Sequence, residues 1–491
     1  MVRAIVRADR AVGAVLASAA GDALGAGYEF GPALTPAAPV LMKGGGGFGW
    51  AAGEWTDDTQ MAIAVLAPLA DGNRDVAAIE TGFREWFLAG PADVGVQTRS
   101  VLSQPGPLRA AAAAYRAANP DGAGNGSLMR TGPVAVGSVG DRDAIADRSA
   151  EISALTHPHD DCIDACVLWS LAIDLSIRTA PGQGDFDWLA VVREGLAALP
   201  PGRRDRWAAL IDEAAANSPR SFTNNGWVVH AFQAALAAIV HTPMPAEQPC
   251  RHLQLALEAA VRCGGDTDTV AAIAGSLLGA RWGATAVPSA WRRIIHGRVT
   301  NAKPSIGGPV LETLARLALS GGTRDAQGWP GVGKLVPYYG DTFGNRAVRA
   351  TLEEIPNVEF GNVAALPEVV RAGADCVVSL CRMGAHDVPD ACEHQVVGLI
   401  DSDLEDNPNL EFMLSDTTDA IHDAVQRGRS VYVHCVAAEN RTPAVAAAYL
   451  IRHSGLDLDS AVATVEKAFR RRPQPMLIRG LAGVQPRGHG S

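Results

Sequence analysis

Two short segments of the chain combine aspartate and threonine in a way that could bind metal ions. They are GEWTDDTQM, residues 53–61, and GGDTDTVAAIAG, residues 264–275. Carboxylate and hydroxyl oxygens are hard ligands, which suit Mg²⁺ or Mn²⁺ better than Zn²⁺. Two such clusters in one site could hold two ions and a bridging water, an arrangement that orients a substrate and lowers the pKa of the water.

Helix capping is the other interpretation of both segments. Each precedes an alanine-rich apolar run, and Asp and Thr are favoured N-cap residues, with acids stabilising a first turn by about 0.3–1 kcal/mol. Capping does not explain why Thr56, Asp57 and Asp58 are consecutive. Nor does it explain Asp266 and Asp268, which as alternate residues of an extended segment can point the same way. The residues alone leave both interpretations open.

A glycine-rich segment, GAGNGSLMR at residues 122–130, could bind phosphate. Its central residues, Gly124, Asn125, Gly126 and Ser127, would let backbone N–H groups approach phosphate oxygens closely. An ordinary glycine-rich loop is the alternative, which the sequence by itself favours. His157, in LTHPHDDC, is either a ligand contact or a capping or core histidine.

The segment VHCVAAENRT, residues 433–442, indicates a different chemistry. Cys435 precedes Arg441 by a five-residue loop, between a predicted strand and a predicted helix. Backbone N–H groups and a helix N-terminus would face one point there, which binds anions and favours a thiolate. Arg441 could bind phosphate through two N–H groups, and Thr442 could assist release of the thiolate. The alternative is a buried cysteine at the end of a strand.

Helical periodicity dominates the first two thirds of the chain, so we expect one large all-α domain there. It is clearest at 61–70, 143–155, 161–177, 205–216, 227–240, 252–262, 269–281 and 309–319. Beyond about residue 335, apolar runs rich in β-branched residues alternate with helical patterns, which is typical of an α/β domain. The predicted strands are 374–381, 394–401 and 430–435, and the predicted helices are 409–427, 441–454 and 457–470.

Glycine and proline cluster between these regions, at about 320–337. We therefore predict an all-α domain at 1–325, a linker at 326–337 and an α/β domain at 338–491. Each domain is long enough to have a core of its own.

Composition restricts the class of protein. The formal net charge of -11 argues against a general nucleic-acid binder, which usually carries a basic patch. The eight cysteines have no framework spacing, so we expect them to be reduced and the protein to be cytoplasmic. No apolar run reaches the roughly 18 residues of a membrane-spanning helix. We expect no membrane association.

Five segments together resemble the ADP-ribosylglycohydrolase family, which includes the dinitrogenase-reductase-activating glycohydrolases. They occur in the family's order and cover most of residues 9–300. The segments are GDALGAGYEF (21–30), GEWTDDTQM (53–61), GNGSLMR (124–130), LTHP (155–158) and GGDTDTVAAIAGSLLGA (264–280). The family fold is all-α, in agreement with the helical periodicity.

The resemblance implies a centre of two Mg²⁺ ions, or Mn²⁺, and cleavage of the glycosidic bond between ADP-ribose and an acceptor. The matching metal ligands are Thr56, Asp57, Asp58, Asp266, Asp268 and Thr269. A nearby carboxylate handles the proton, and Asp57 and Glu29 are both candidates. Residues 124–127 would hold the diphosphate, and His157 would contact the ligand.

The segment around Cys435 resembles the dual-specificity branch of the cysteine-dependent protein-tyrosine phosphatases. Members of that family have a general-acid aspartate roughly 30 residues before the cysteine. In this chain, IDSDLEDNPNLEF (400–412) contains three candidates, Asp401, Asp403 and Asp406. We favour Asp403. Ala438 stands where the family usually has glycine, and Glu439 adds an acid to the loop. These departures leave the substrate class open.

The combined expectation is a two-domain enzyme that cleaves an ADP-ribosyl bond and has a second, cysteine-dependent phosphatase activity that needs no cofactor. Its expected partners are an ADP-ribosylated protein or small molecule and a phosphorylated substrate. Nucleic acid is not an expected partner, although ADP-ribosylated nucleic acid is not excluded. In the alternative, the C-terminal domain is an inactive module that binds phosphate and targets the glycohydrolase.

Overall fold

The computed structural model describes residues 2–35, 37–180, 186–324, 339–340, 344, 346–383, 387–402 and 404–487. The chain divides into two compact units. One comprises Met1–Pro245, Cys250–Val287 and Trp291–Thr323, and the other Ala246–Pro249, Pro288–Ala290 and Arg324–Ser491. The predicted linker, 326–337, lies outside the described residues.

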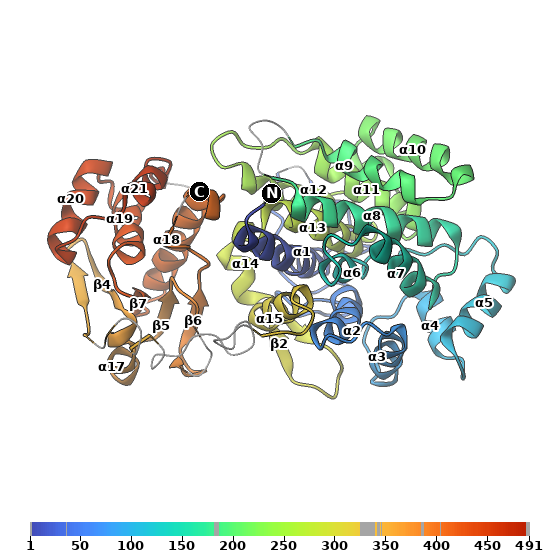
Figure 1. The fold of residues 1–491 in the computed structure, drawn as a ribbon, viewed down its shortest axis with the longest axis horizontal. Coiled ribbons are helices and arrows are strands. Elements are labelled where there is room, and N and C mark those ends of the chain that lie inside the picture. Colours follow the sequence, from blue (N-terminus) through green and yellow to red (C-terminus); the bar gives the residue numbers. More distant parts are fainter. Residues whose placement is uncertain are drawn as a thin grey trace. The chain divides into compact units, whose positions relative to one another are not determined.

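Helices are the dominant secondary structure of the chain up to residue 319 (Figure 1), which confirms the expected all-α domain. They are α1 (Ala4–Gly25), α2 (Asp57–Ala70), α3 (Val76–Leu88), α4 (Val96–Leu102), α5 (Leu108–Ala118), α6 (Gly132–Val136), α7 (Arg142–Ala154), α8 (Asp160–Arg178), α9 (Trp188–Glu194), α10 (Pro201–Ala216), α11 (Val228–His241), α12 (His252–Val261), α13 (Thr267–Trp282), α14 (Ser289–Ile294) and α15 (Gly308–Leu319). Short 3₁₀ turns lie at Gly195–Ala198, Pro219–Ser221, Pro249–Arg251 and Ala284–Ala286. A short antiparallel hairpin of β1 (His296–Arg298) and β2 (Ser305–Gly307) was not predicted.

Helices α1 and α13 pack against each other in the interior of this unit. Their backbones approach so closely that only glycine fits at several contacts. A Cβ on Gly21 would lie 2.3 Å from the carbonyl oxygen of Ala271, and one on Gly25 would lie 2.4 Å from Cα of Asp268. The antiparallel crossing therefore brings the N-terminal end of α13 against the C-terminal end of α1.

The C-terminal unit is an α/β domain, as predicted. Its elements are β3 (Arg349–Leu352), β4 (Ile355–Asn362), a 3₁₀ turn (Val363–Ala365), α17 (Leu366–Arg371), β5 (Cys376–Ser379), β6 (Glu393–Val396), a 3₁₀ turn (Leu404–Asp406), α18 (Leu410–Gln426), β7 (Val431–Cys435), α19 (Arg441–Ser454), α20 (Leu458–Phe469) and α21 (Pro475–Leu481). The five-stranded sheet has the order β3-β4-β7-β5-β6. Strand β3 is antiparallel to β4, and the other pairs are parallel.

Strand β7 lies at the centre of this sheet, and its side chains alternate between two cores. Val431, Val433 and Cys435 join the core that contains residues of α18 to α21, whereas Tyr432 joins the core that contains residues of α17. This alternation is the period of two expected of a strand. The last residue of β7, Cys435, is thus delivered to the side of the sheet on which α19 begins.

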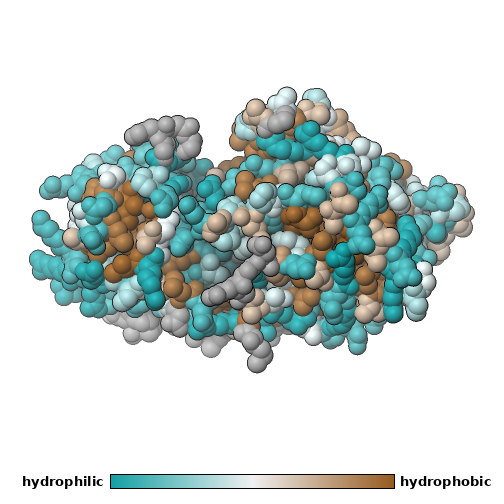
Figure 2. All heavy atoms as spheres, turned by 90° about the horizontal axis from the view of Figure 1, so that it is seen from above, coloured by the Kyte–Doolittle hydropathy of each residue, from teal (hydrophilic) through white to brown (hydrophobic). Residues whose placement is uncertain are grey.

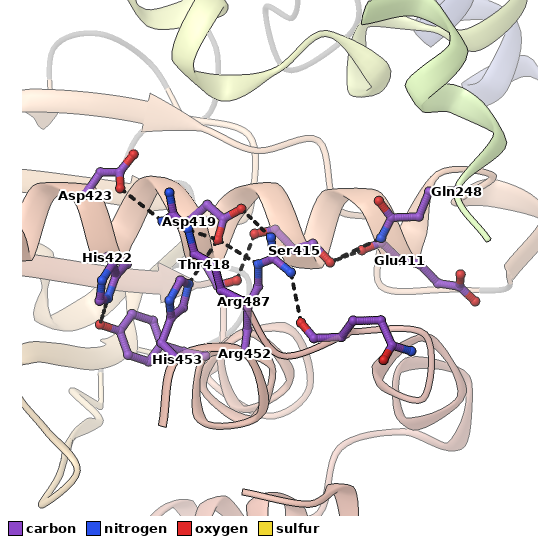
Figure 3. Close-up of polar contacts among 12 residues, drawn as sticks. Gln248, Glu411, Ser415, Thr418, Asp419, His422, Asp423, Arg452, His453 and Arg487 are labelled. Carbon is purple, nitrogen blue, oxygen red and sulfur yellow. Dashed lines mark hydrogen bonds and ion pairs between the residues drawn. The ribbon is translucent and has the colours of Figure 1, made fainter. Parts of the chain in front are cut away.

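A partly buried cluster of ion pairs joins α18 to α19 (Figure 3). Asp419 accepts hydrogen bonds from Nε and Nη2 of Arg452 at 2.6 and 2.7 Å, and Nε2 of His453 lies 3.1 Å from Oδ1 of Asp419. Burial raises the pKa of Asp419, but the bonds from His453 and Arg452 outweigh it and lower the pKa to about 2. This carboxylate has the partners that its charge requires.

Among the described residues, no helix is both long and apolar enough to cross a bilayer. Hydrophilic residues cover much of the face shown in Figure 2, with hydrophobic patches between them. The large apolar side chains that are exposed include Phe30, Leu41, Phe48, Leu88 and Val96.

Candidate active sites

The first aspartate–threonine cluster forms the N-terminus of α2. Thr56 is the N-cap residue, and its hydroxyl oxygen accepts a hydrogen bond from the N–H group of Asp58 at 3.4 Å. Asp22 of α1 accepts hydrogen bonds from the N–H group of Thr56 at 2.9 Å and from the hydroxyl of Thr59 at 2.6 Å. Asp22 therefore fixes the start of α2, a role that sequence reasoning missed.

The second cluster forms the N-terminus of α13. Asp266 is the N-cap residue without a capping side-chain bond, and Asp268 lies in the first turn. The side-chain oxygen of Asn225 accepts a hydrogen bond from the N–H group of Asp266 at 3.0 Å. A Cβ on Gly265, whose φ is +71°, would lie 2.4 Å from that oxygen, so glycine is required at this position.

One hydrogen bond joins the two clusters across 211 positions of the sequence. The hydroxyl of Thr269 donates to Oδ2 of Asp58 at 3.4 Å. Glu29, Asp266 and Asp268 also each offer a carboxylate oxygen within 4.8 Å of the other two. Two helix N-termini and the segment that follows α1 thus meet at one acidic site.

The charges at this site are poorly balanced by the protein itself. Burial raises the pKa of Asp57, Asp58 and Asp268 well above the ordinary value, and neighbouring carboxylates raise it further. Burial, together with Asp266, raises the pKa of Glu29 to about 8. Oδ1 of Asp58 is buried without a hydrogen-bond partner among the described residues. An oxygen-rich, acidic donor set with an orphaned carboxylate oxygen fits a divalent cation.

Asp93, in the loop between α3 and α4, is a further acidic residue of the site that the sequence did not reveal. Of the charges that raise the pKa of Asp57, that of Asp93 has the largest effect after burial. Burial and Asp266 raise the pKa of Asp93 as well. No aspartate–threonine pattern surrounds Asp93, so only the fold identifies it.

The glycine-rich loop is attached to the acidic site through Asn125. Its side-chain amide donates to Oδ2 of Asp266 at 2.7 Å and to the carbonyl oxygen of Asn225 at 2.9 Å. The N–H groups of Gly126 and Ser127 have no acceptor in the described part of the chain. These consecutive free donors can bind an anion.

His157 lies against this loop and is buried. A Cβ on Gly126 would lie 3.2 Å from Nε2 of His157, so glycine is needed for the approach. Burial and the nearby Arg130 hold the pKa of His157 well below its usual range, so the ring is neutral.

A cavity of about 540 Å³ adjoins the same loop at Gly124. Gly124 pairs with Trp227 in an isolated antiparallel bridge. The cavity is lined by Asp121, Ala123, Gly124, His159, Asp161, Asn224, Gly226 and Trp227. It is large enough for a heterocyclic base with its sugar.

In the C-terminal unit, Cys435 ends β7 and Arg441 begins α19, as the sequence predicted. Ala438, at the position where the family usually has glycine, has a φ of +57°. The loop therefore keeps a left-handed residue although its side chain is not hydrogen. Nη1 of Arg441 donates to the carbonyl oxygens of Leu380 at 2.7 Å and Leu399 at 3.3 Å.

Nε of Arg441 has no hydrogen bond among the described residues, but it forms an ion pair with Asp401, one of the candidate acids. Of the candidate acids, Asp401 has its Oδ2 atom 3.6 Å from Nε of Arg441. Asp406 instead accepts a hydrogen bond from Ser402, and the favoured acid, Asp403, lies outside the described residues.

Two other loop residues suggested by the sequence have partners of their own. The hydroxyl of Thr442 donates to the carbonyl oxygen of Gly361 at 3.1 Å. Glu439 forms an ion pair with Arg471 near the surface. The acid of the loop is therefore neutralised by a neighbouring arginine.

Two histidines and a serine form a buried network next to Cys435 in the sheet, which the sequence analysis did not predict. The hydroxyl of Ser379 on β5 lies 2.7 Å from Nε2 of His434 and 3.0 Å from Nε2 of His394 on β6. Burial lowers the pKa of His434 to about 3 and that of His394 to about 4, so both rings are neutral. The network joins the three strands β7, β5 and β6.

Comparison with known proteins agrees with the two families that the sequence resembles. The profile of the ADP-ribosylglycohydrolase family matches residues 3–327, and that of the dual specificity phosphatase catalytic domain matches residues 386–482. The ADP-ribosylarginine hydrolase Tri1 of Pseudomonas putida is 31% identical over 292 residues, which cover 58% of this chain and 73% of that protein.

The ADP-ribosyl-[dinitrogen reductase] glycohydrolase of Rhodospirillum rubrum is 30% identical over 291 residues, which cover 58% of this chain and 89% of that protein. A solved structure described as an ADP-ribosylglycohydrolase-related protein complex has a TM-score of 0.50 and 27% identity, and the match covers 65% of this chain and 99% of that one. The chain belongs to the ADP-ribosylglycohydrolase family of hydrolases, and a dual-specificity phosphatase catalytic domain is fused to its C-terminal side.

Proposed function

We propose that the helical unit is a metal-dependent hydrolase that releases ADP-ribose from an acceptor, with two Mg²⁺ ions for which Mn²⁺ can substitute. The observation that carries the proposal is the meeting of three distant segments. Thr269 bonds to Asp58, and Asn125 bonds to Asp266. An anion loop and a set of metal ligands thus lie side by side, as a substrate with a diphosphate next to a ribose requires.

The residues present suit the two ions. The ligands would be Thr56, Asp57, Asp58, Asp266, Asp268 and Thr269, of which Asp58 has the clearest open bonding position, at its orphaned Oδ1 atom. When bound, such ions hold ribose hydroxyls, polarise a water molecule and lower its pKa.

The rest of ADP-ribose would extend from the acidic site along the glycine-rich loop. The free N–H groups of Gly126 and Ser127 would hold the diphosphate, together with His157. The adenosine part would occupy the cavity of about 540 Å³, where the indole of Trp227 offers a face for stacking of the base.

Hydrolysis needs one proton to be moved at the ribose. The oxygen of water bonds to the anomeric carbon, the bond from that carbon to the acceptor breaks, and the acceptor keeps the electron pair and gains a proton. Glu29 is only partly buried and offers a carboxylate oxygen within 4.8 Å of those of Asp266 and Asp268, so it can take and give a proton beside the proposed metal ligands. Asp57 is the alternative, although it is buried.

The acceptor proposed first is arginine, because the Pseudomonas putida relative is named for that linkage. The test is release of ADP-ribose from a panel of substrates linked through arginine, serine, a small molecule or nucleic acid, each with Mg²⁺, Mn²⁺ or a chelator. We expect release from the arginine substrate with either ion and none after chelation. Undiminished turnover after exhaustive chelation would contradict the metal dependence.

For the C-terminal unit we propose a cysteine-dependent phosphatase. The thiolate of Cys435 would form a sulfur–phosphorus bond as the ester bond breaks, an acid from residues 401–406 would protonate the leaving oxygen, and water would then release phosphate. The position of Arg441 at the start of α19 and the left-handed backbone of Ala438 support this proposal. No cofactor is needed.

Hydrolysis of a generic aryl phosphate by the full-length chain tests this second activity, with Cys435→Ser as the control. We expect turnover in the wild type and none in the variant. If the wild type binds phosphate without turnover, the C-terminal unit is instead a phosphate-binding module. A cytoplasmic location is proposed as well, because all eight cysteines are free thiols.

A further inference from the structure

A chain of buried hydrogen bonds leads from Arg130 to His157. Arg130 is fully buried, and its Nη2 atom donates to the hydroxyl oxygen of Thr156 at 2.5 Å. That oxygen lies 2.7 Å from Nδ1 of His157. The guanidinium is held in place by the ring of Phe83, 4.2 Å from its centroid, and by Sδ of Met61 at 3.2 Å from Nη1.

The proton positions in this chain follow from the kinds of atom involved. A guanidinium only donates, so the hydroxyl oxygen of Thr156 accepts from Arg130. The hydroxyl has one proton to donate, and Nδ1 of His157 is the acceptor that the described residues offer it. Nδ1 then carries no proton, so the single proton of the neutral ring is on Nε2.

Nε2 of His157 points to the glycine-rich loop. It lies 3.5 Å from a Cβ built on Gly124 and 3.2 Å from one built on Gly126. No acceptor for it exists among the described residues, although the histidine is buried, with only 1% of its surface exposed. The N–H groups of Gly126 and Ser127 lack acceptors in the described chain too. Nε2 of His157 and these two N–H groups are three donors at one loop without an acceptor among the described residues, and together they can bind an anion.

We propose that Arg130 and Thr156 are positioning residues that lock His157 in the tautomer with the proton on Nε2, as a neutral donor to a phosphate oxygen of ADP-ribose. The phosphate role rests on the proposed function, whereas the tautomer does not. A neutral donor has a physical advantage at this position, because an imidazolium would be repelled by Arg130 and by metal ions at the acidic site.

The tautomer can be observed directly in the full-length protein labelled with ¹⁵N-histidine, because the two ring nitrogens of a neutral imidazole differ in chemical shift according to which carries the proton. The resonances of His157 are assigned by their loss in His157→Gln. We expect the proton on Nε2 in the wild type and in Thr156→Ser, and a mixture of tautomers in Thr156→Val. A wild-type spectrum with the proton on Nδ1 would overturn the inference, whether or not the variants fold.

The phosphate role is tested by calorimetric titration of the same proteins with ADP-ribose in the presence of Mg²⁺. We expect roughly tenfold weaker binding in Thr156→Val, since a hydrogen bond to a charged group is weakened, and recovery to within about twofold in Thr156→Ser. Thr242→Val is the matched control, because Thr242 follows the last residue of α11 and its hydroxyl donates to the carbonyl oxygen of Ala238 in that helix. Unchanged affinity in Thr156→Val would overturn the phosphate role.

Failure of the proposed function can be distinguished from failure of the tautomer inference. A wild type that does not bind ADP-ribose contradicts the proposed function and the phosphate role with it, and the spectrum of that same sample still confirms or overturns the tautomer.

Discussion

The acidic site of the helical unit and the cysteine loop of the α/β unit are electrostatic opposites. The first gathers buried carboxylates whose strongest charged neighbours are other carboxylates, so that their pKa values are raised. The second places the thiol of Cys435 at the end of β7, one loop before Arg441 at the start of α19. Under the proposed function, cations would complete the first site and an anion the second, so the two sites would respond to different ligands.

The two sites also differ in how far apart in the sequence their residues lie. Cys435 and Arg441 are adjacent to one loop. The acidic site instead needs the bonds from Thr269 to Asp58 and from Asn125 to Asp266, across 211 and 141 positions. The cysteine and arginine of the second site are thus close in sequence, although the carbonyl oxygens of Leu380 and Leu399 that hold Arg441 come from distant segments.

The largest expected effect is a separation of the two activities. Asp266→Asn removes a carboxylate from the metal site and should lower ADP-ribose release by at least about 10²-fold, with aryl phosphate hydrolysis unchanged. Cys435→Ser should do the reverse, by on the order of 10⁴-fold or more, because it removes the nucleophile. Both rates are measured on each full-length variant. Loss of both activities in either variant would mean that the sites are not independent.

The second largest expected effect is on the thermal stability of each unit, and it tests whether the two sites bind ligands of opposite charge. Mg²⁺ at about 100 times its Kd should stabilise the helical unit by about 2.7 kcal/mol through binding to the folded state alone. Vanadate should act on the α/β unit in the same way. Thermal unfolding resolved by unit checks this, with Asp266→Asn expected to lose the response to Mg²⁺ and to keep that to vanadate. A Mg²⁺ response that persists in Asp266→Asn would show that the ion stabilises the protein elsewhere.

A smaller effect is expected at Asp419, whose carboxylate is paired with basic side chains, unlike the carboxylates of the acidic site. Asp419→Asn breaks the bonds to Arg452 and His453 and should destabilise the α/β unit by about 1–3 kcal/mol at neutral pH. Because the folded pKa of Asp419 is lowered to about 2 from 3.8, its contribution is present above pH 3.8 and is lost as the pH falls through 2.

Urea unfolding of wild type and variant at neutral pH measures the difference. Asp423→Asn is the control, since its carboxylate is about half exposed and pairs with Arg487 near the surface. Equal effects of the two substitutions would show that the Asp419 cluster of Figure 3 adds no particular stability.

The smallest expected effect is at Ala438. Its left-handed backbone costs an alanine about 1–2 kcal/mol, and glycine would remove that cost while adding about 0.4–1 kcal/mol of unfolded-state entropy. Ala438→Gly should therefore stabilise the α/β unit by about 1 kcal/mol or less and leave phosphatase turnover within about twofold. Chemical unfolding gives the first quantity, and aryl phosphate turnover gives the second. Destabilisation would mean that the alanine side chain contributes packing that outweighs the strain.

Much of the architecture could be predicted from local patterns. Periodicity of 3.6 residues predicts α2, α7, α8 and α13 within a few residues of their observed bounds, because each buries one face. Apolar, β-branched runs likewise predict β5 and β7. Strands β3 and β4 and the hairpin of β1 and β2 were not predicted, since short strands are defined by pairing with distant segments rather than by their own pattern.

The sequence by itself determined which reactive and ligand-binding groups the chain contains. They are hard oxygen ligands before two helices, a glycine-rich loop, and a cysteine separated from an arginine by five residues. Only the tertiary structure decided how these parts meet. It brought Asp22 and Asp93 to the acidic site, left the N–H groups of Gly126 and Ser127 free, and put Asp401 beside Arg441. The physical reason is that a residue's type sets which bonds it can form, whereas its partner is set by the packing of helices and strands that are far apart in the chain.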